Sequence, residues 1–189
     1  MATSFYTTAL MEQLYHQGFI GIVVTTTLDY HEDVIAKTSQ EFVDGTIHQF
    51  PSFDDPKLND ASVNFPDPNG FDAEFRKRHP NDWSAVSWEY PAIMLQWLEG
   101  AKAAESIDST AVLNALKNNP NPPHPFGEGR WWGKELWGRD SIVVGNWPVV
   151  VIEGGKTRIK EFGSVSGWLD KHSDVLIKYM KSHGLRTVS

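Results

Sequence analysis

A continuous apolar run near the N-terminus constrains the fold more than any other feature of the sequence. Residues 19–27 read Phe-Ile-Gly-Ile-Val-Val-Thr-Thr-Thr, rich in β-branched side chains and without polar alternation. Such a run is typical of a strand buried on both faces, as in a parallel sheet. Ahead of it, Leu10 and Leu14 recur at helical spacing, and Gly18 suits the left-handed position that ends a helix.

The segments that follow continue an alternation of helix and strand. Acidic residues at 29–33 suit the N-terminal end of a helix, whose predicted apolar stripe is Val34, Ile35, Thr38 and Phe42, with an end at Asp44-Gly45. Residues 46–50 then read as a short second strand. Helix, strand, helix and strand over residues 4–50 together predict an α/β fold.

The rest of the chain is punctuated by prolines and glycines. Residues 51–80 hold five of the eleven prolines and read either as a connection between lobes or as a long surface loop, with a helix only toward residue 78. The other predicted elements are a helix at 83–105 kinked at Pro91, a helix at 109–116, an antiparallel hairpin at 141–162 turning at Gly154-Gly155, and a terminal helix at 164–183.

Composition excludes several classes of function. The 189 residues carry 17 Lys and Arg against 24 Asp and Glu, a net charge of −7, so we expect no affinity for nucleic acid or anionic membranes. The chain has no cysteine, which excludes disulfides and thiolate nucleophiles. No stretch approaches the roughly 20 apolar residues of a membrane-spanning helix. The first residues lack the pattern of a secretory signal, so we expect no signal peptide.

Motifs for catalysis, metals and nucleotides are missing from the sequence. Seven histidines are present, but no HExxH pair occurs, and the neighbours His31, Glu32 and Asp33 do not face one another on a helix. No phosphate-binding glycine loop and no GxSxG elbow occur either. We therefore expect a protein without catalytic residues, metal or cofactor.

One positional signal points to ligand binding. In open α/β sheets, ligands gather beyond the carboxyl ends of strands, and the first predicted strand ends in Thr25, Thr26 and Thr27, followed by Asp29. These side chains either hold a small polar ligand or cap the strand and the next helix. Trp88 and Tyr90 stand near the start of the long helix and either wall a ligand or, for Trp88 above all, belong to the core.

The order of several motifs carries a resemblance to a known family. The motifs are Gly18-Phe19-Ile20-Gly21, Phe42-Val43-Asp44-Gly45-Thr46, the segments 71–78 and 88–95, Trp131-Trp132-Gly133-Lys134-Glu135-Leu136-Trp137-Gly138-Arg139-Asp140, Trp147-Pro148-Val149-Val150 and Gly154-Gly155-Lys156-Thr157. In this order they resemble the C-terminal half of the type I periplasmic solute-binding proteins, the branched-chain amino acid and amide receptors of ABC transporters.

This resemblance implies a fold of parallel strands flanked by helices, with a late antiparallel hairpin. Family members are longer, with a signal peptide and a complete N-terminal lobe, so we expect a partial or truncated fold here. By the same resemblance, residues 1–50 form part of the C-terminal lobe, 51–125 a connection plus helices of the other lobe, and 126–189 a return crossing, the hairpin and the terminal helix.

The resemblance also implies a function without catalysis. It is that of a solute-binding component of an ABC transporter, which holds a small solute in a cleft between lobes and delivers it to a permease. The full-length relative is periplasmic or extracellular. The alternative is a truncated structural module that binds no solute and forms a homo-oligomer.

The family pattern bears on the ligand as well. Amino-acid-binding members place a carboxylate after the strand matched by residues 19–25, where this chain has Thr26 and Thr27, with Asp29 a little beyond. An amino acid, an amide and a carboxylate are therefore all open as ligands. The family's cleft aromatic matches Tyr90 better than Trp88.

Overall fold

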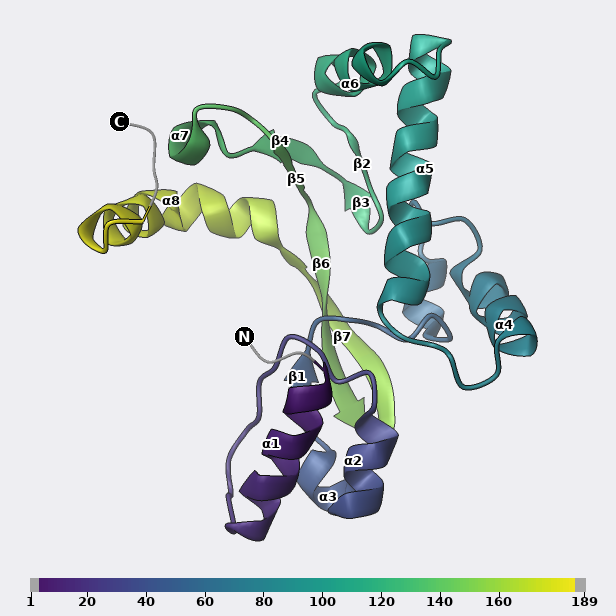
Figure 1. The fold of residues 1–189 in the computed structure, drawn as a ribbon, viewed down its shortest axis with the longest axis vertical. Helices are drawn as coiled ribbons and strands as arrows, with labels where there is room; N and C mark the ends of the chain where they lie inside the picture. Colours follow the sequence, from purple (N-terminus) through teal and green to yellow (C-terminus); the bar gives the residue numbers. More distant parts are fainter. Residues whose placement is uncertain (1–3, 186–189) are drawn as a thin grey trace. The chain divides into compact units, whose positions relative to one another are not determined.

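The computed structural model describes residues 4–185 of the chain (Figure 1). Its elements, in chain order, are α1 (Ser4–His16), α2 (His31–Lys37), α3 (Gln40–Val43), β1 (Ile47–His48), the 3₁₀ helix η1 (Pro56–Asn59), α4 (Pro68–Arg78), α5 (Val86–Ala104), α6 (Ser109–Asn118), β2 (Pro123–His124), β3 (Gly127–Glu128), β4 (Arg130–Trp132), α7 (Lys134–Trp137), β5 (Ile142–Val144), β6 (Asn146–Glu153), β7 (Lys156–Ser164) and α8 (Val165–Ser182).

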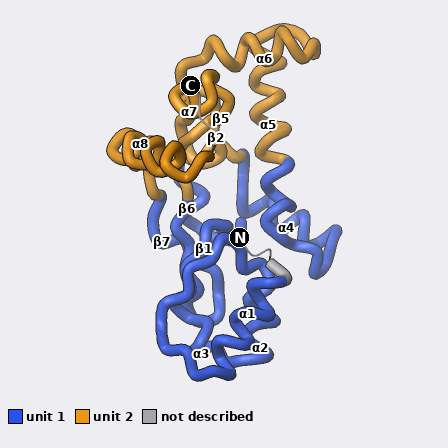
Figure 2. Tube along the Cα trace, turned by 60° about the vertical axis from the view of Figure 1, so that its left-hand side comes forward, with its two compact units in different colours: residues 1–60, 66–90, 148–162 blue, residues 61–65, 91–147, 163–189 orange. Residues whose placement is uncertain are grey.

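The chain divides into two compact units, each made of segments distant in sequence (Figure 2). Unit 1 comprises residues 1–60, 66–90 and 148–162, and unit 2 comprises residues 61–65, 91–147 and 163–189. The predicted assignment of residues 1–50, 51–125 and 126–189 to lobes stays a prediction.

Unit 1 is built around a sheet in the order β1-β6-β7. β1 and β6 are antiparallel, with Ile47 opposite Val151, and β6 and β7 form the predicted hairpin. Gly154 and Gly155 at its turn have φ of +59° and +71°, which a two-residue turn between antiparallel strands requires. The helices pack on this sheet through one apolar core, whose buried members are Met11, Leu28, Val34, Val43 and Ile152.

The prediction of a buried strand at residues 19–27 is wrong. The segment is irregular, and its parallel pairing is limited to a single bridge between Val24 and Ile47. Ile20 is 98% exposed and Ile22 is 74% exposed. The β-branched composition favours a strand, but the chain bends at Gly21 and Thr26. Burial also requires neighbouring chain, and the described residues supply a strand on one edge only.

The predicted single helix from residue 30 to Asp44 is two helices, α2 and α3. The break falls at Thr38 and Ser39, whose hydroxyls take up local hydrogen bonds instead of continuing the helix. Thr38 Oγ1 donates to the Val34 carbonyl at 2.6 Å, and Ser39 Oγ accepts from the Phe42 N–H at 3.1 Å. Ser39 thereby becomes the N-cap of α3.

A buried carboxylate fixes η1 of unit 1 against the hairpin. Asp55 is buried, and its two oxygens accept hydrogen bonds from the Lys57 N–H at 2.9 Å and the Ile159 N–H at 2.8 Å. Lys57 Nζ donates in turn to the carbonyl of Ile159 at 2.8 Å. These bonds give order to the proline-rich region that the sequence marked as a connection or loop.

Unit 2 holds the remaining predicted helices and two short antiparallel pairs, β2 with β3 and β4 with β5. Asn64 fastens the first pair, because its Nδ2 donates to the carbonyls of His124 at 2.9 Å and Gly127 at 2.6 Å. α6 begins as predicted, with Asp108 accepting from two backbone N–H groups. Among the described residues, no helix is long and apolar enough to cross a membrane.

Candidate functional site

The carboxyl ends of two parallel segments meet at one edge of unit 1. The Thr25 N–H donates to the Ile47 carbonyl at 2.9 Å, and the Ile47 N–H donates to the Val23 carbonyl at 2.9 Å. The chain continues from this point into Thr26 and Thr27 on one side and past His48 on the other. This is the position where α/β folds bind ligands, and the first prediction for the site rests on it.

The three threonines differ in their surroundings. Thr25 Oγ1 donates to the Thr27 carbonyl at 3.3 Å and lies 3.5 Å from the Thr7 hydroxyl, so it is occupied within the protein. Thr26 is half-buried. Thr27 Oγ1 is buried and has no hydrogen-bond partner within residues 4–185. Of the three hydroxyls, that of Thr27 is the buried one without a hydrogen bond inside the described part of the chain.

His48 is the residue that sequence reasoning missed. It is 4% exposed, and neither ring nitrogen has a hydrogen-bond partner in the described part of the chain. Burial, and then the nearby His31, lower the pKa of His48 to about 4, so its imidazole is neutral at pH 7. A neutral imidazole offers one N–H donor and one nitrogen acceptor. The available signal was a histidine in the middle of the strand predicted at residues 46–50.

The carboxyl group of Asp29, which follows the threonines, interacts with that of Glu89. Burial, and after it the Asp29 carboxylate, raise the pKa of Glu89 above its ordinary value. Asp29 was predicted as a site residue and Glu89 was not. The connection after residue 25 therefore lies near the first turn of α5, where Glu89 is located.

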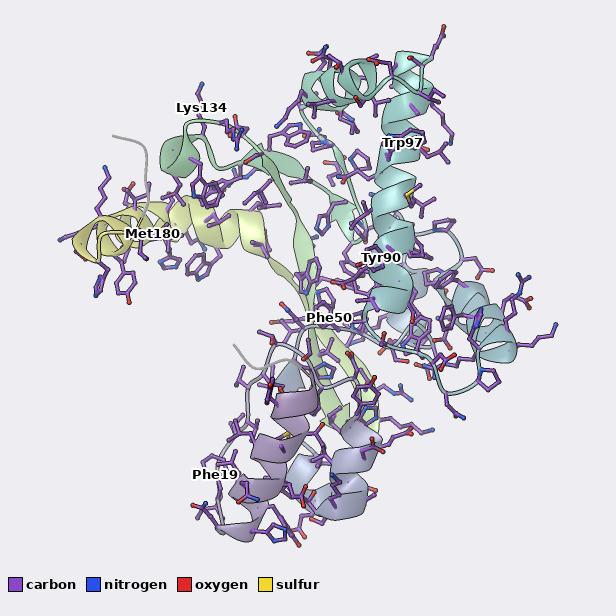
Figure 3. The ribbon with its side chains drawn as sticks, viewed as in Figure 1. Phe19, Phe50, Tyr90, Trp97, Lys134 and Met180 are labelled. Carbon is purple, nitrogen blue, oxygen red and sulfur yellow. The ribbon has the colours of Figure 1, made fainter. Side chains whose placement is uncertain are left out.

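The two predicted aromatic residues occupy different environments. Trp88 is buried, stacks on Phe53 at 5.0 Å between ring centroids, and meets Phe50 edge-on at 6.3 Å. Its surroundings are those of a core residue, the second reading that the sequence allowed. Tyr90, in contrast, is exposed on α5 (Figure 3). All six predicted residues, with His48 and Glu89, lie within unit 1.

The site has no arrangement suited to a metal ion. Within residues 4–185, no three His, Asp or Glu side chains are placed to hold one. The polar groups of the candidate residues are instead hydrogen-bonding groups of both kinds: the Thr27 hydroxyl, the neutral His48 imidazole and the carboxyls of Asp29 and Glu89. Such a set can fix the orientation of a small polar molecule.

Solved structures are the known proteins that this chain matches. No protein-family model and no curated protein matches the chain. Among solved structures, it is similar to the leucine binding protein LivK of Thermotoga maritima, with 17% identity and a TM-score of 0.59 over 88% of this chain and 44% of that one.

Two further solved structures are extracellular ligand-binding receptors, one from Rhodopseudomonas palustris and one from its strain HaA2. Their identities are 16% and 18%, their TM-scores 0.54 and 0.52, and each match covers 82% of this chain and 45% of the other. The chain therefore spans less than half the length of these structures. Its fold is part of the type I periplasmic-binding-protein fold, as the order of its motifs predicted.

Proposed function

We propose that this chain binds a small polar solute in unit 1, at the carboxyl ends of residues 23–25 and β1. The observation that carries the proposal is the pair of unsatisfied polar side chains there, the His48 imidazole and the Thr27 hydroxyl. A buried polar group without a partner costs about 1–3 kcal/mol. A solute that hydrogen-bonds to both side chains recovers that cost on binding.

The charges of the site narrow the chemistry of the solute. Neutral His48 and the Thr27 hydroxyl each supply a donor and an acceptor. Asp29 and Glu89 add carboxyl oxygens. These oxygens accept hydrogen bonds from N–H groups, and a negative charge on them repels a negatively charged solute. An amide or an amino acid, each of which has N–H donors, therefore fits these four side chains better than a simple carboxylate does. The threonine hydroxyls by themselves do not distinguish among the three classes of solute.

The transport role is a proposal that rests on the fold. The similar structures are a leucine binding protein and extracellular ligand-binding receptors. By this likeness, we propose that the solute is bound without chemical change, outside the cytoplasm, for delivery to the permease of an ABC transporter.

Calorimetric titration and thermal shift test the binding proposal directly. The panel contains leucine, small aliphatic amides, urea and small carboxylates. A ligand at a hundredfold excess over its Kd stabilises the folded state by about 2.7 kcal/mol, which a melting curve resolves. Absence of heat and of any shift with every compound, in a folded sample, contradicts the proposal.

Variants localise the response to the site. Thr27→Val replaces the hydroxyl with a methyl group of similar size, so it is expected to weaken binding while leaving the fold intact. Thr110→Val on the outer face of α6 is the matched control and is expected to bind as the unaltered chain does. Equal affinities of the two variants place the ligand elsewhere.

A further inference from the structure

β7 is an edge strand whose outer backbone groups are held by side chains rather than by another strand. It lies at one end of the sheet β1-β6-β7, and within residues 4–185 its strand partner is β6 alone (Figure 1). It has nine residues, against about 5–6 in a typical strand. A long edge strand with free N–H and C=O groups is a template for pairing with another chain.

The 3₁₀ helix η1 and its N-cap residue Asp55 occupy this outer edge at Ile159. The Ile159 N–H donates to the Asp55 carboxylate at 2.8 Å, and the Ile159 carbonyl accepts from Lys57 Nζ at 2.8 Å. In an antiparallel sheet the N–H and C=O of one residue point to the same side, so both face η1. Lys57 Nζ also donates to the Lys160 carbonyl at 2.8 Å. A carboxylate and an ammonium thus make the hydrogen bonds that an added strand would make.

These contacts place charge where a second strand would have to lie. Asp55 is buried, whereas Lys57 is exposed. Arg158 adds a guanidinium nearby, because its Nη1 donates to the Thr157 carbonyl at 2.7 Å. A second β7 that paired with this edge would have to displace Lys57, and it would bring a Lys57 and an Arg158 of its own. Like charges therefore oppose the approach.

We propose that Asp55 and Lys57 form a strap that closes the edge of β7 and prevents a second copy of the chain from extending the sheet. The Asp55 carboxylate by itself anchors η1, because it accepts from both the Lys57 and the Ile159 N–H groups. The Lys57 ammonium adds cover for two carbonyls of β7. In a purified sample, a second copy is the polypeptide that can supply a strand. The inference does not depend on solute binding.

Lys57→Met tests the strap, because it keeps the length of the side chain and removes the ammonium. Lys57 is exposed, so the variant is expected to remain folded, which circular dichroism and urea unfolding check. In sedimentation over a range of concentrations, it is expected to self-associate about tenfold or more strongly than the unaltered chain, the change that newly available hydrogen bonds give. Lys156→Met, at an exposed position of the same strand, is the matched control and is expected to sediment as the unaltered chain does. Lys57→Arg keeps a cationic donor and is expected to do the same.

Hydrogen exchange locates the association. As the concentration of Lys57→Met rises, amides within residues 157–161 are expected to exchange more slowly, because they become paired with a second copy. Protection that increases elsewhere instead, for example in the exposed residues 19–24, overturns the proposal. A Lys57→Met variant that sediments as the unaltered chain does, or equal association of Lys57→Met and Lys156→Met, overturns it as well.

Discussion

Protonation of His48 is expected to destabilise unit 1 in mild acid. In the unfolded chain the imidazole binds a proton near its ordinary pKa of 6.5, whereas in the folded chain burial delays protonation until the pH is about 4. Between these values the unfolded state binds more protons, so the free energy of unfolding falls as the pH falls. Above pH 6.5 both states are neutral and the effect disappears.

The size of the effect follows from the two pKa values. Each tenfold change in proton affinity is worth about 1.4 kcal/mol, so a pKa lowered from 6.5 to about 4 costs the folded state about 3 kcal/mol by pH 4. Burial also lowers the pKa of His124 in unit 2 to about 4, which adds a loss of the same sign. A pH titration alone measures the stability lost through both histidines, so a substitution at His48 is needed to measure the part due to His48.

Urea unfolding of His48→Leu between pH 4 and 7.5 measures how much stability the chain loses through protonation of His48. The variant is expected to lose about 3 kcal/mol less than the unaltered chain over this range, and to be at least as stable at pH 7, because it no longer buries two unpaired nitrogens. His172→Leu, at an exposed position on α8, is the control and is expected to keep the full pH dependence.

The same variant separates a binding role of His48 from a structural one. If His48 contacts the solute, His48→Leu gains or keeps stability but loses the thermal response to ligand. A variant with unchanged acid sensitivity refutes the burial argument. A variant that still binds the solute refutes the assignment of His48 to the site.

Further predictions concern the contacts that hold each unit together. Asp55→Ala leaves two backbone N–H groups unpaired and is expected to lower the free energy of unfolding by about 2–4 kcal/mol, against less than about 1 kcal/mol for the neighbouring exposed Asp54→Ala. Asn64→Ala is expected to cost about 1–3 kcal/mol and Asn114→Ala, on the exposed face of α6, almost nothing, both measured by urea unfolding. Gly133→Ala is expected to lower the melting temperature by several degrees, because φ is +118° and a Cβ there would lie 2.7 Å from the Trp137 ring; an unchanged melting curve contradicts that geometry.

Local chemistry explains the elements that were predicted correctly. Gly18 ends α1 at φ +70°, Asp108 caps α6, and two glycines with positive φ turn the hairpin between β6 and β7. Each of these depends on residues within a few positions of one another. The order of such elements, together with the motifs between them, was enough to indicate the fold.

Only part of the candidate site was predicted from the sequence. The carboxyl end of an extended segment predicted Thr25, Thr26, Thr27 and Asp29, since this follows from strand order alone. His48 and Glu89 were missed because their significance lies in contacts across the fold. Within the described residues, the His48 ring is buried without a hydrogen bond and lies near His31. Glu89 lies on a helix far along the chain and interacts electrostatically with Asp29.

Burial is the property that the sequence could not decide. The composition of residues 19–27 predicted a strand, of which the structure has only the bridge at Val24, and that of α5 predicted a helix, which is present. Neither composition determined which faces are covered. In α5, Trp88 is buried, whereas Ile93 and Met94 are exposed. Backbone conformation is chosen by short-range sterics and hydrogen bonds that a sequence encodes locally. Burial depends on which distant segments lie against a side chain, and only the tertiary structure brings those segments together.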